Sequence, residues 1–298
     1  MNTIVESTTK PKSAGERGHT GTAFGCARDF LGNRFVYIVI SARARGLSVG
    51  VNLTPDKECN FDCPYCEVDR LVPGRDAELD LNVLSAELEA TLAFVNSGQL
   101  GESPFYVSVP ADLLRLRHVA ISGDGEPTLC RQFREAVETV VHVRARVRAP
   151  FFKIVLITNA SNLDATEVQR GLQLLTRRDE IWAKLDAGTQ AYMSRVNKTT
   201  VPLEKIMSNI LLVARERPVI IQSLFPALDG SGPDEEEIAC YAQRLQTLKD
   251  AGAQIPLVQI YSATRPAPNS ACGHLPLRRL SQIAQTVRNV TGLNAEVF

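Results

Sequence analysis

Short apolar runs alternate with longer amphipathic stretches along most of the chain. The runs are rich in Val, Ile and Leu, as expected for parallel strands that are covered on both faces. They predict strands at 47–53, 118–123, 153–158, 180–186, 219–225 and 256–262. The stretches between them predict helices at 80–96, 131–146, 163–175, 202–216, 234–251 and 277–291. One helix has a clear start signal, because Pro233-Asp234 is followed by three glutamates.

Strand–helix units repeated along the chain indicate an α/β fold built from right-handed β–α–β units. Such units form either an open doubly wound sheet or a barrel. The chain lacks both the G-x-G-x-x-G and the G-x4-G-K phosphate motifs, which disfavours a doubly wound nucleotide-binding sheet. We therefore expect a partial (β/α)6 barrel of the TIM type, with parallel strands, over residues 34–298. Residues 1–33 are rich in Gly, Ser, Thr and Lys and predict a short, flexible N-terminal arm.

Polar side chains collect where the predicted strands end. In a barrel, the chemistry lies at the carboxyl ends of the strands. The residues at these ends are Glu126, Asn159, Asp186, Gln222 and Arg265. The loop at 264–276 follows a strand, so we expect it to lie over the same face.

The composition is that of an ordinary globular protein, with 44% hydrophobic and 22% charged residues. The 33 basic and 33 acidic residues cancel, so no general attraction to DNA or to an anionic membrane is expected. The polar N-terminus lacks the apolar core of a secretory signal, and no apolar run is long enough to span a bilayer. We expect a cytoplasmic protein, whose thiols stay reduced.

Three cysteines crowd into the segment KECNFDCPYC, at Cys59, Cys63 and Cys66. Pro64 suits the first position of a turn, which would bring the sulfurs together on one metal centre. Structural zinc needs four ligands, and a redox Cys-x2-Cys pair would leave Cys59 unexplained. Three thiolates instead suit an iron–sulfur cluster with one open iron. The spacing favours this reading and leaves zinc and redox chemistry open.

The stretch CNFDCPYC resembles the signature of the radical S-adenosylmethionine (radical SAM) enzymes. In that family three cysteines hold a 4Fe-4S cluster, and the methionine part of S-adenosylmethionine binds the fourth iron. One electron then cleaves the sulfonium to a 5′-deoxyadenosyl radical, which abstracts hydrogen from the substrate. The resemblance implies both cofactors for this chain, and an electron donor such as flavodoxin or ferredoxin.

Further stretches resemble the same family, notably SGDGEPTL, ITNAS and KLDAG. The resemblance implies that these stretches, the aromatic residue before the last cysteine and a glutamine on the next strand bind the cofactor. The residues are Tyr65, Gly123, Gly125, Glu126, Thr158, Asn159, Lys184, Asp186 and Gln222. A tight turn, a helix cap and a structural Lys–Asp ion pair are the plainer alternatives for these stretches. Expected on the substrate side are Gln259, Tyr261, Arg265 and Cys272.

Within the superfamily, the chain looks most similar to the branch of the wyosine-base synthases of tRNA and their bacterial relatives. Only Cys26 lies upstream of the motif, so a second cluster on N-terminal cysteines is not expected. The substrate stays open between a tRNA base, a small molecule and, for a glycyl-radical activase, a partner protein. A non-catalytic zinc or redox module is the remote alternative. Cys130 and Cys240 are predicted to be small core residues.

Overall fold

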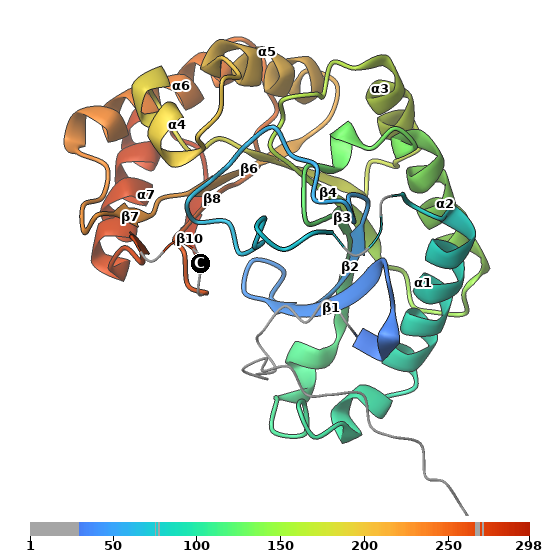
Figure 1. Cartoon of the computed structure of the whole chain (residues 1–298). Helices are drawn as coiled ribbons and strands as arrows, with labels where there is room; N and C mark the ends of the chain where they lie inside the picture. Colours follow the sequence, from blue (N-terminus) through green and yellow to red (C-terminus); the bar gives the residue numbers. More distant parts are fainter. Residues whose placement is uncertain (1–29, 75, 77, 266–268, 270) are drawn as a thin grey trace, which may run out of the picture.

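The computed structural model describes residues 30–74, 76, 78–265, 269 and 271–298. Eight strands form one curled sheet with the order β1-β2-β3-β4-β5-β6-β8-β10, and helices cover its outside (Figure 1). The strands are β1 (Val36–Ser41), β2 (Gly46–Asn52), β3 (Leu116–Ser122), β4 (Lys153–Thr158), β5 (Glu180–Lys184), β6 (Val219–Leu224), β8 (Val258–Tyr261) and β10 (Ala295–Val297). Two further strands, β7 (Ala227–Leu228) and β9 (Cys272–Gly273), form a small antiparallel pair.

All neighbours from β2 to β10 pair in parallel, and β1 alone of the sheet's described strands runs antiparallel, beside β2. The predicted partial barrel is therefore confirmed. The six predicted strands are all present, with their ends within two residues of the expected positions. The six predicted helices are present too, as α1 (Leu81–Asn96), α2 (Phe133–Arg146), α3 (Thr166–Gln173), α5 (Leu203–Ala214), α6 (Glu235–Asp250) and α7 (Leu277–Thr291).

The helices bury one stripe each against the sheet. In α2 the buried positions are Phe133, Ala136, Val137, Val140 and Val143, which follow the spacing of one helix face. The start signal of α6 is confirmed, since the Asp234 carboxylate accepts a hydrogen bond from the Glu237 amide at 2.8 Å. Among the described helices, none is both long and apolar enough to cross a membrane.

Several elements were not predicted from the sequence. They are the edge strands β1 and β10, the small strands β7 and β9, the short helix α4 (Gln190–Val196) and short 3-10 turns. Most of the expected N-terminal arm lies outside the described residues. Its last part is seen: Phe30 packs edge-on against Phe94, with ring centres 5.8 Å apart, and Asn33 donates a hydrogen bond to Thr91 at 3.0 Å.

The two edges of the sheet face each other across an opening, near the C-terminus (Figure 1). The turn between β1 and β2, residues 42–45, is called the hairpin tip below, and it reaches across this opening. Arg45 forms an ion pair with Glu296 of β10 at 2.7 Å, and the Arg43 guanidinium lies 4.1 Å from the centre of the Tyr261 ring. The hairpin tip therefore forms part of the wall of the space inside the curled sheet.

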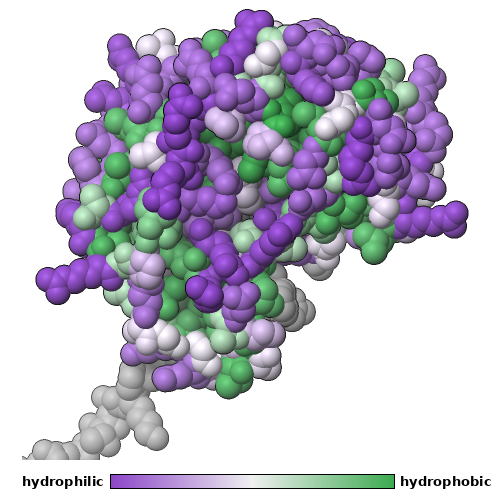
Figure 2. Space-filling view, turned by 180° about the vertical axis from the view of Figure 1, so that it is seen from behind, coloured by the Kyte–Doolittle hydropathy of each residue, from purple (hydrophilic) through white to green (hydrophobic). Residues whose placement is uncertain are grey.

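The outer surface is mostly polar. Hydrophilic residues cover much of the face seen in Figure 2, and hydrophobic residues gather mainly toward its lower end. Exposed apolar side chains in the segment 97–117 include Phe105 and Val107. Scattered exposure of this kind is normal for a globular protein.

Candidate functional site

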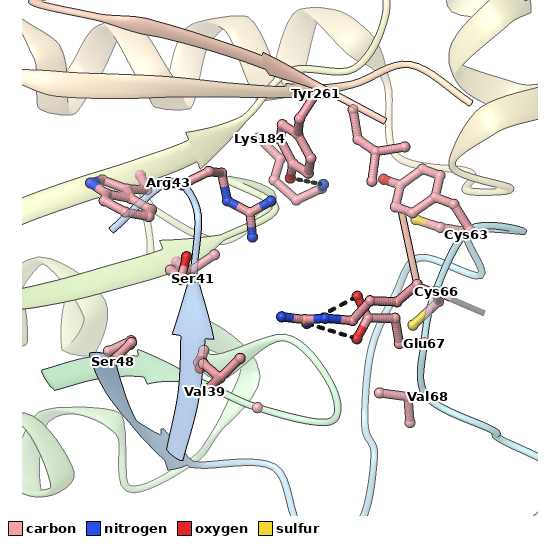
Figure 3. A pocket seen from close by; sticks show the side chains of 18 of the residues that line it. Val39, Ser41, Arg43, Ser48, Cys63, Cys66, Glu67, Val68, Lys184 and Tyr261 are labelled. Carbon is pink, nitrogen blue, oxygen red and sulfur yellow. Dashed lines mark hydrogen bonds and ion pairs between the residues drawn. The ribbon is translucent and has the colours of Figure 1, made fainter. Parts of the chain in front are cut away.

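A cavity of about 940 Å³ occupies the inside of the curled sheet (Figure 3). Its walls come from the β1–β2 hairpin, the ends of the parallel strands, and residues 57–70, called the cysteine loop below. Most of the predicted site residues border this one cavity: Cys59, Cys63, Tyr65, Cys66, Gly123, Gly125, Glu126, Thr158, Asn159, Lys184, Tyr261 and Arg265.

Four predicted site residues do not border the cavity. Gln222 and Gln259 are buried and bond to each other at 2.9 Å. Cys272 lies in β9, away from the cavity, and is half-buried. Asp186 is buried behind the cysteine loop. The expected roles of these four in direct cofactor or substrate binding have no support from their positions.

Glycines let the strand end after β3 approach the cysteine loop. A side chain at Gly125 would place its Cβ 1.8 Å from the carbonyl oxygen of Glu58, just before Cys59. One at Gly123 would meet the side chains of Asn52 and Thr54 at 2.5 and 2.6 Å. The Glu126 amide donates a hydrogen bond to the same Glu58 carbonyl at 2.9 Å. The glycines therefore seat the cysteine loop on the strand ends.

Side-chain amides fix the first half of the cysteine loop. Asn60 accepts a hydrogen bond from Asn159 at 2.8 Å and donates one to Ser161 at 2.9 Å. The Thr199 hydroxyl donates to the Asn60 carbonyl at 2.8 Å. Asn159 thus positions the loop in addition to bordering the cavity.

Asn197, at the end of α4, holds the second half of the loop and was not found from the sequence. Its amide donates to the Tyr65 hydroxyl and to Asp186, each at 2.9 Å, and lies 3.5 Å from the Cys63 sulfur. Asp186 also accepts a short hydrogen bond from Tyr65 and one from the Leu224 amide at 2.8 Å. Asp186 and Tyr65 therefore join the loop to the strands β5 and β6.

The three thiols of the motif are free and half-buried. Burial raises the pKa of Cys59 and raises that of Cys63 to about 12, so both are protonated at neutral pH. Arg70 lies beside Cys59 and Cys66, and hydrogen bonding to these sulfurs raises its pKa against the opposing effect of burial. Among the described residues, no group of three or more His, Cys, Asp or Glu side chains converges closely enough to hold a single metal ion.

Glu126 is a buried carboxylate at the opposite side of the cysteine motif. One oxygen accepts hydrogen bonds from the Thr128 amide and hydroxyl and from the Thr158 hydroxyl, at 2.5 to 3.1 Å. The other accepts one from the Asn159 amide at 2.6 Å. Burial raises the pKa of Glu126, and these donors oppose the shift. The second oxygen keeps capacity for a further donor.

Lys184 is a half-buried cation of the site. It forms an ion pair with Asp186 at 3.5 Å and donates to the Tyr261 hydroxyl at 3.3 Å. The negative charge of Asp186 raises the pKa of Lys184 although burial opposes this. The structural Lys–Asp pair, expected as the plainer alternative, is present, but Lys184 still borders the cavity.

Solved structures that share this fold include radical SAM enzymes. A radical SAM methyltransferase from Sphaerobacter thermophilus is 16% identical and covers 90% of this chain and 70% of its own, with a TM-score of 0.60. TYW1 with a lysine–pyruvate adduct bound is 13% identical over 86% of this chain and 84% of its own, with a TM-score of 0.55. SuiB from Streptococcus suis, bound to S-adenosylmethionine, is 14% identical over 82% and 49%, with a TM-score of 0.56. At these identities the comparison shows that the chain shares the fold of these enzymes.

No family model matches the chain. Among curated proteins it is similar to a UPF0026 protein of Helicobacter pylori, with 29% identity over 181 residues, which are 59% of this chain and 50% of the relative. A UPF0026 protein of Synechocystis is 24% identical over 184 residues, covering 61% of this chain and 60% of its own. The matches thus span about half the length of the first relatives.

Proposed function

We propose that the chain is a radical SAM enzyme, in which Cys59, Cys63 and Cys66 hold a 4Fe-4S cluster and S-adenosylmethionine binds beside it. One observation carries this proposal. Three free thiols and the buried carboxylate of Glu126 border the same cavity, at the carboxyl ends of parallel strands. That is where barrels place their reactive groups.

The donor set fits such a cluster. Thiolates are the usual protein ligands of iron–sulfur clusters, and three of them leave one iron for another ligand. Arg70 beside Cys59 and Cys66 offers positive charge to offset that of the bound thiolates. Because Cys63 is protonated when free, binding the cluster must release its proton.

The groups around the cysteines suit the ends of the methionine part of S-adenosylmethionine. The second oxygen of Glu126 can accept a hydrogen bond from an ammonium group, with Thr158 and the Asn159 amide holding the carboxylate in place. Lys184 is a protonated cation on the next strand and suits a carboxylate. We assign Gly123 and Gly125 the role of allowing close approach of the backbone, since neither has a side chain that could bind the cofactor.

When bound, the cluster supplies one electron for cleavage of the sulfonium, which yields a 5′-deoxyadenosyl radical for hydrogen abstraction. The electron must come from a reduced protein, such as flavodoxin or ferredoxin. The chain's own part is to orient the two ligands and to keep bulk water from the reacting atoms. The cavity walls of Ile157, Leu224 and Trp182 serve this purpose.

The substrate of the proposed reaction is a tRNA base or a small molecule. The TYW1 neighbour carries a lysine–pyruvate adduct. In this chain, Asp186 holds Lys184 in its protonated form. A protonated lysine suits binding of an anion and not attack on a carbonyl group. A glycyl-radical activase that acts on a partner protein is the second candidate, and shares the same cavity chemistry.

The test is anaerobic reconstitution of the full chain with iron and sulfide, followed by S-adenosylmethionine and dithionite. We expect about four irons per chain, brown colour and 5′-deoxyadenosine as product. Cys63→Ala should lose all three, while Cys240→Ala, a half-buried cysteine that does not border the cavity, should retain them. Uptake of zinc alone by the intact chain would overturn the proposal.

A further inference from the structure

Arg43 is a cation in the cavity wall that has no counter-charge among the described residues. It comes from the hairpin tip, opposite the cysteine loop, and its guanidinium extends toward Lys184 and Tyr261 (Figure 3). Its Nε atom is buried and has no hydrogen-bond partner in the described part of the chain. Its one described stabilising contact is the ring of Tyr261, 4.1 Å away. Burying part of a guanidinium without partners for its N–H donors costs free energy, and a ligand that accepts these hydrogen bonds removes that cost.

Three of the other four cations that border the cavity form ion pairs. The fourth, Arg70, lies beside two of the proposed cluster ligands, although its Nε atom, like that of Arg43, has no described partner. The ion pairs are Arg45–Glu296, Lys184–Asp186 and Arg265–Glu67, and Arg70 lies beside Cys59 and Cys66. Arg43 is therefore the cation on the hairpin side of the cavity whose bonding capacity remains open to a ligand, whereas Arg70 lies with the proposed cluster ligands.

A second group with open bonding capacity borders the same cavity. His118 is 1% exposed, packs edge-on against Trp182 with ring centres 5.2 Å apart, and its Nδ1 atom has no described partner. Burial, with the charges of Lys153 and Arg43, lowers the pKa of His118 to about 3. A neutral imidazole can donate one hydrogen bond to an anion without adding charge.

The hairpin tip is held in position before any ligand arrives. The Arg45 amide donates to the Ala42 carbonyl at 2.9 Å, which closes the turn. Arg117 donates to the Arg45 carbonyl at 2.9 Å, and Arg45 itself is tied to Glu296. Because the turn is fixed on both sides, little ordering is needed for Arg43 to bind a ligand.

We propose that Arg43, assisted by His118, forms an oxyanion-binding site for a carboxylate or phosphate group of the substrate. Describing that anion as part of the substrate rests on the proposed function. Lys184 lies on the cysteine side of Tyr261, 4.9 Å from the ring of Tyr65, and is assigned to the cofactor. The cavity is thus divided between a cofactor end at the cysteine loop and an anion-binding end at the hairpin.

The tryptophan Trp182 is the only one in the sequence and borders the cavity, so its fluorescence reports occupancy directly. The full-length chain is titrated with inorganic phosphate, malonate and the uncharged malonamide. We expect saturable binding of phosphate or malonate, and the preferred one identifies phosphate or carboxylate as the chemistry. Arg43→Gln should weaken this binding about tenfold or more, since it removes charge-assisted hydrogen bonds.

Arg115→Gln is the control. It removes an arginine whose side chain is 73% exposed and does not border the cavity, so binding should change by less than about twofold. Arg43→Lys should retain part of the affinity because it keeps the charge. Three outcomes would each overturn the proposed site. Arg43→Gln could bind anions as well as the unaltered chain does, malonamide could bind as well as malonate, or no anion could bind at all.

The titration is run with the cluster-free chain and, by calorimetry, with the reconstituted one. If no cluster assembles but anions bind through Arg43, the proposed function fails and the anion site stands. If the cluster assembles and cleaves S-adenosylmethionine but Arg43→Gln binds anions normally, the anion site fails and the proposed function stands.

Discussion

The two walls of the cavity differ in how completely their polar groups are bonded. On the cysteine side, Asn60, Asn159, Asn197 and Asp186 form a closed network with the loop backbone and with one another. On the hairpin side, the Arg43 Nε and the His118 Nδ1 have no described partners. The network on the cysteine side is thus bonded throughout, although the Nε atom of Arg70 beside it has no described partner, whereas both named groups on the hairpin side keep open bonding capacity.

Saturated polar networks fix a single geometry, whereas unpartnered groups offer bonds to a ligand. The difference teaches that the cysteine loop is organised before its proposed cofactors bind, at the cost of burying Asp186 and Glu126. The hairpin wall instead keeps hydrogen-bonding groups that a ligand can occupy. Changes on the cysteine side should therefore act through the fold, and changes on the hairpin side through ligands or protons.

The largest effect is expected for Gly125→Ala. The new Cβ would lie 1.8 Å from the Glu58 carbonyl, so the cysteine loop must move off the strand ends. We expect the free energy of unfolding to fall by about 3 kcal/mol or more, and most iron loading to be lost. Urea unfolding and iron analysis measure both. Gly101→Ala is the control, since its Cβ would meet only a Leu114 methyl at 3.7 Å; similar losses in both variants would contradict the seating role.

An intermediate effect is expected for Asn197→Ala, which opens the saturated network. It removes the amide donor shared by Tyr65 and Asp186, and leaves the buried carboxylate short of one hydrogen bond. The free energy of unfolding should fall by about 1–3 kcal/mol, with slower cluster assembly. Asn289→Ala, on the exposed face of α7, should change neither quantity. If the two variants behave alike, the network does not hold the loop.

The smallest effect concerns protons on the hairpin side. The pKa of His118 is about 3 in the folded chain against 6.5 for an ordinary histidine. Between these values the unfolded chain holds the extra proton, so the free energy of unfolding should fall as pH falls below 6.5, by up to about 1.4 kcal/mol per pH unit. His118→Phe should flatten this slope in urea titrations between pH 6.5 and 4.5. The control His142→Gln, at an exposed histidine, should leave the slope unchanged. An unchanged slope in His118→Phe would show that His118 is protonated in the folded chain.

The parallel core could be predicted because its strands are continuous apolar runs, and buried parallel strands require such runs. The edge strand β1 was missed although its residues are apolar, because the turn that follows it, Ala42 to Arg45, has none of the usual turn residues. The strand β10 and the helix α4 are too short to show a period.

At the site, the motifs named cysteines, Glu126 and Lys184 that all border one cavity. Asp186 was expected at the cofactor together with Lys184. However, β5 ends at Lys184, and Asp186 does not border the cavity. Asn197 and Arg43 were not found, because their importance arises from contacts with distant segments and not from any local pattern.

The hairpin tip joins the antiparallel edge strand β1 to β2, the first of the parallel strands. A turn in that position can change in length or sequence without altering the register of the seven parallel strands, whose pairing runs from β2 to β10. If the proposed function holds, such a turn can vary what the cavity accepts while the proposed cluster site stays constant. Exchanging residues 42–45 between homologous chains is thus a direct route to altered selectivity.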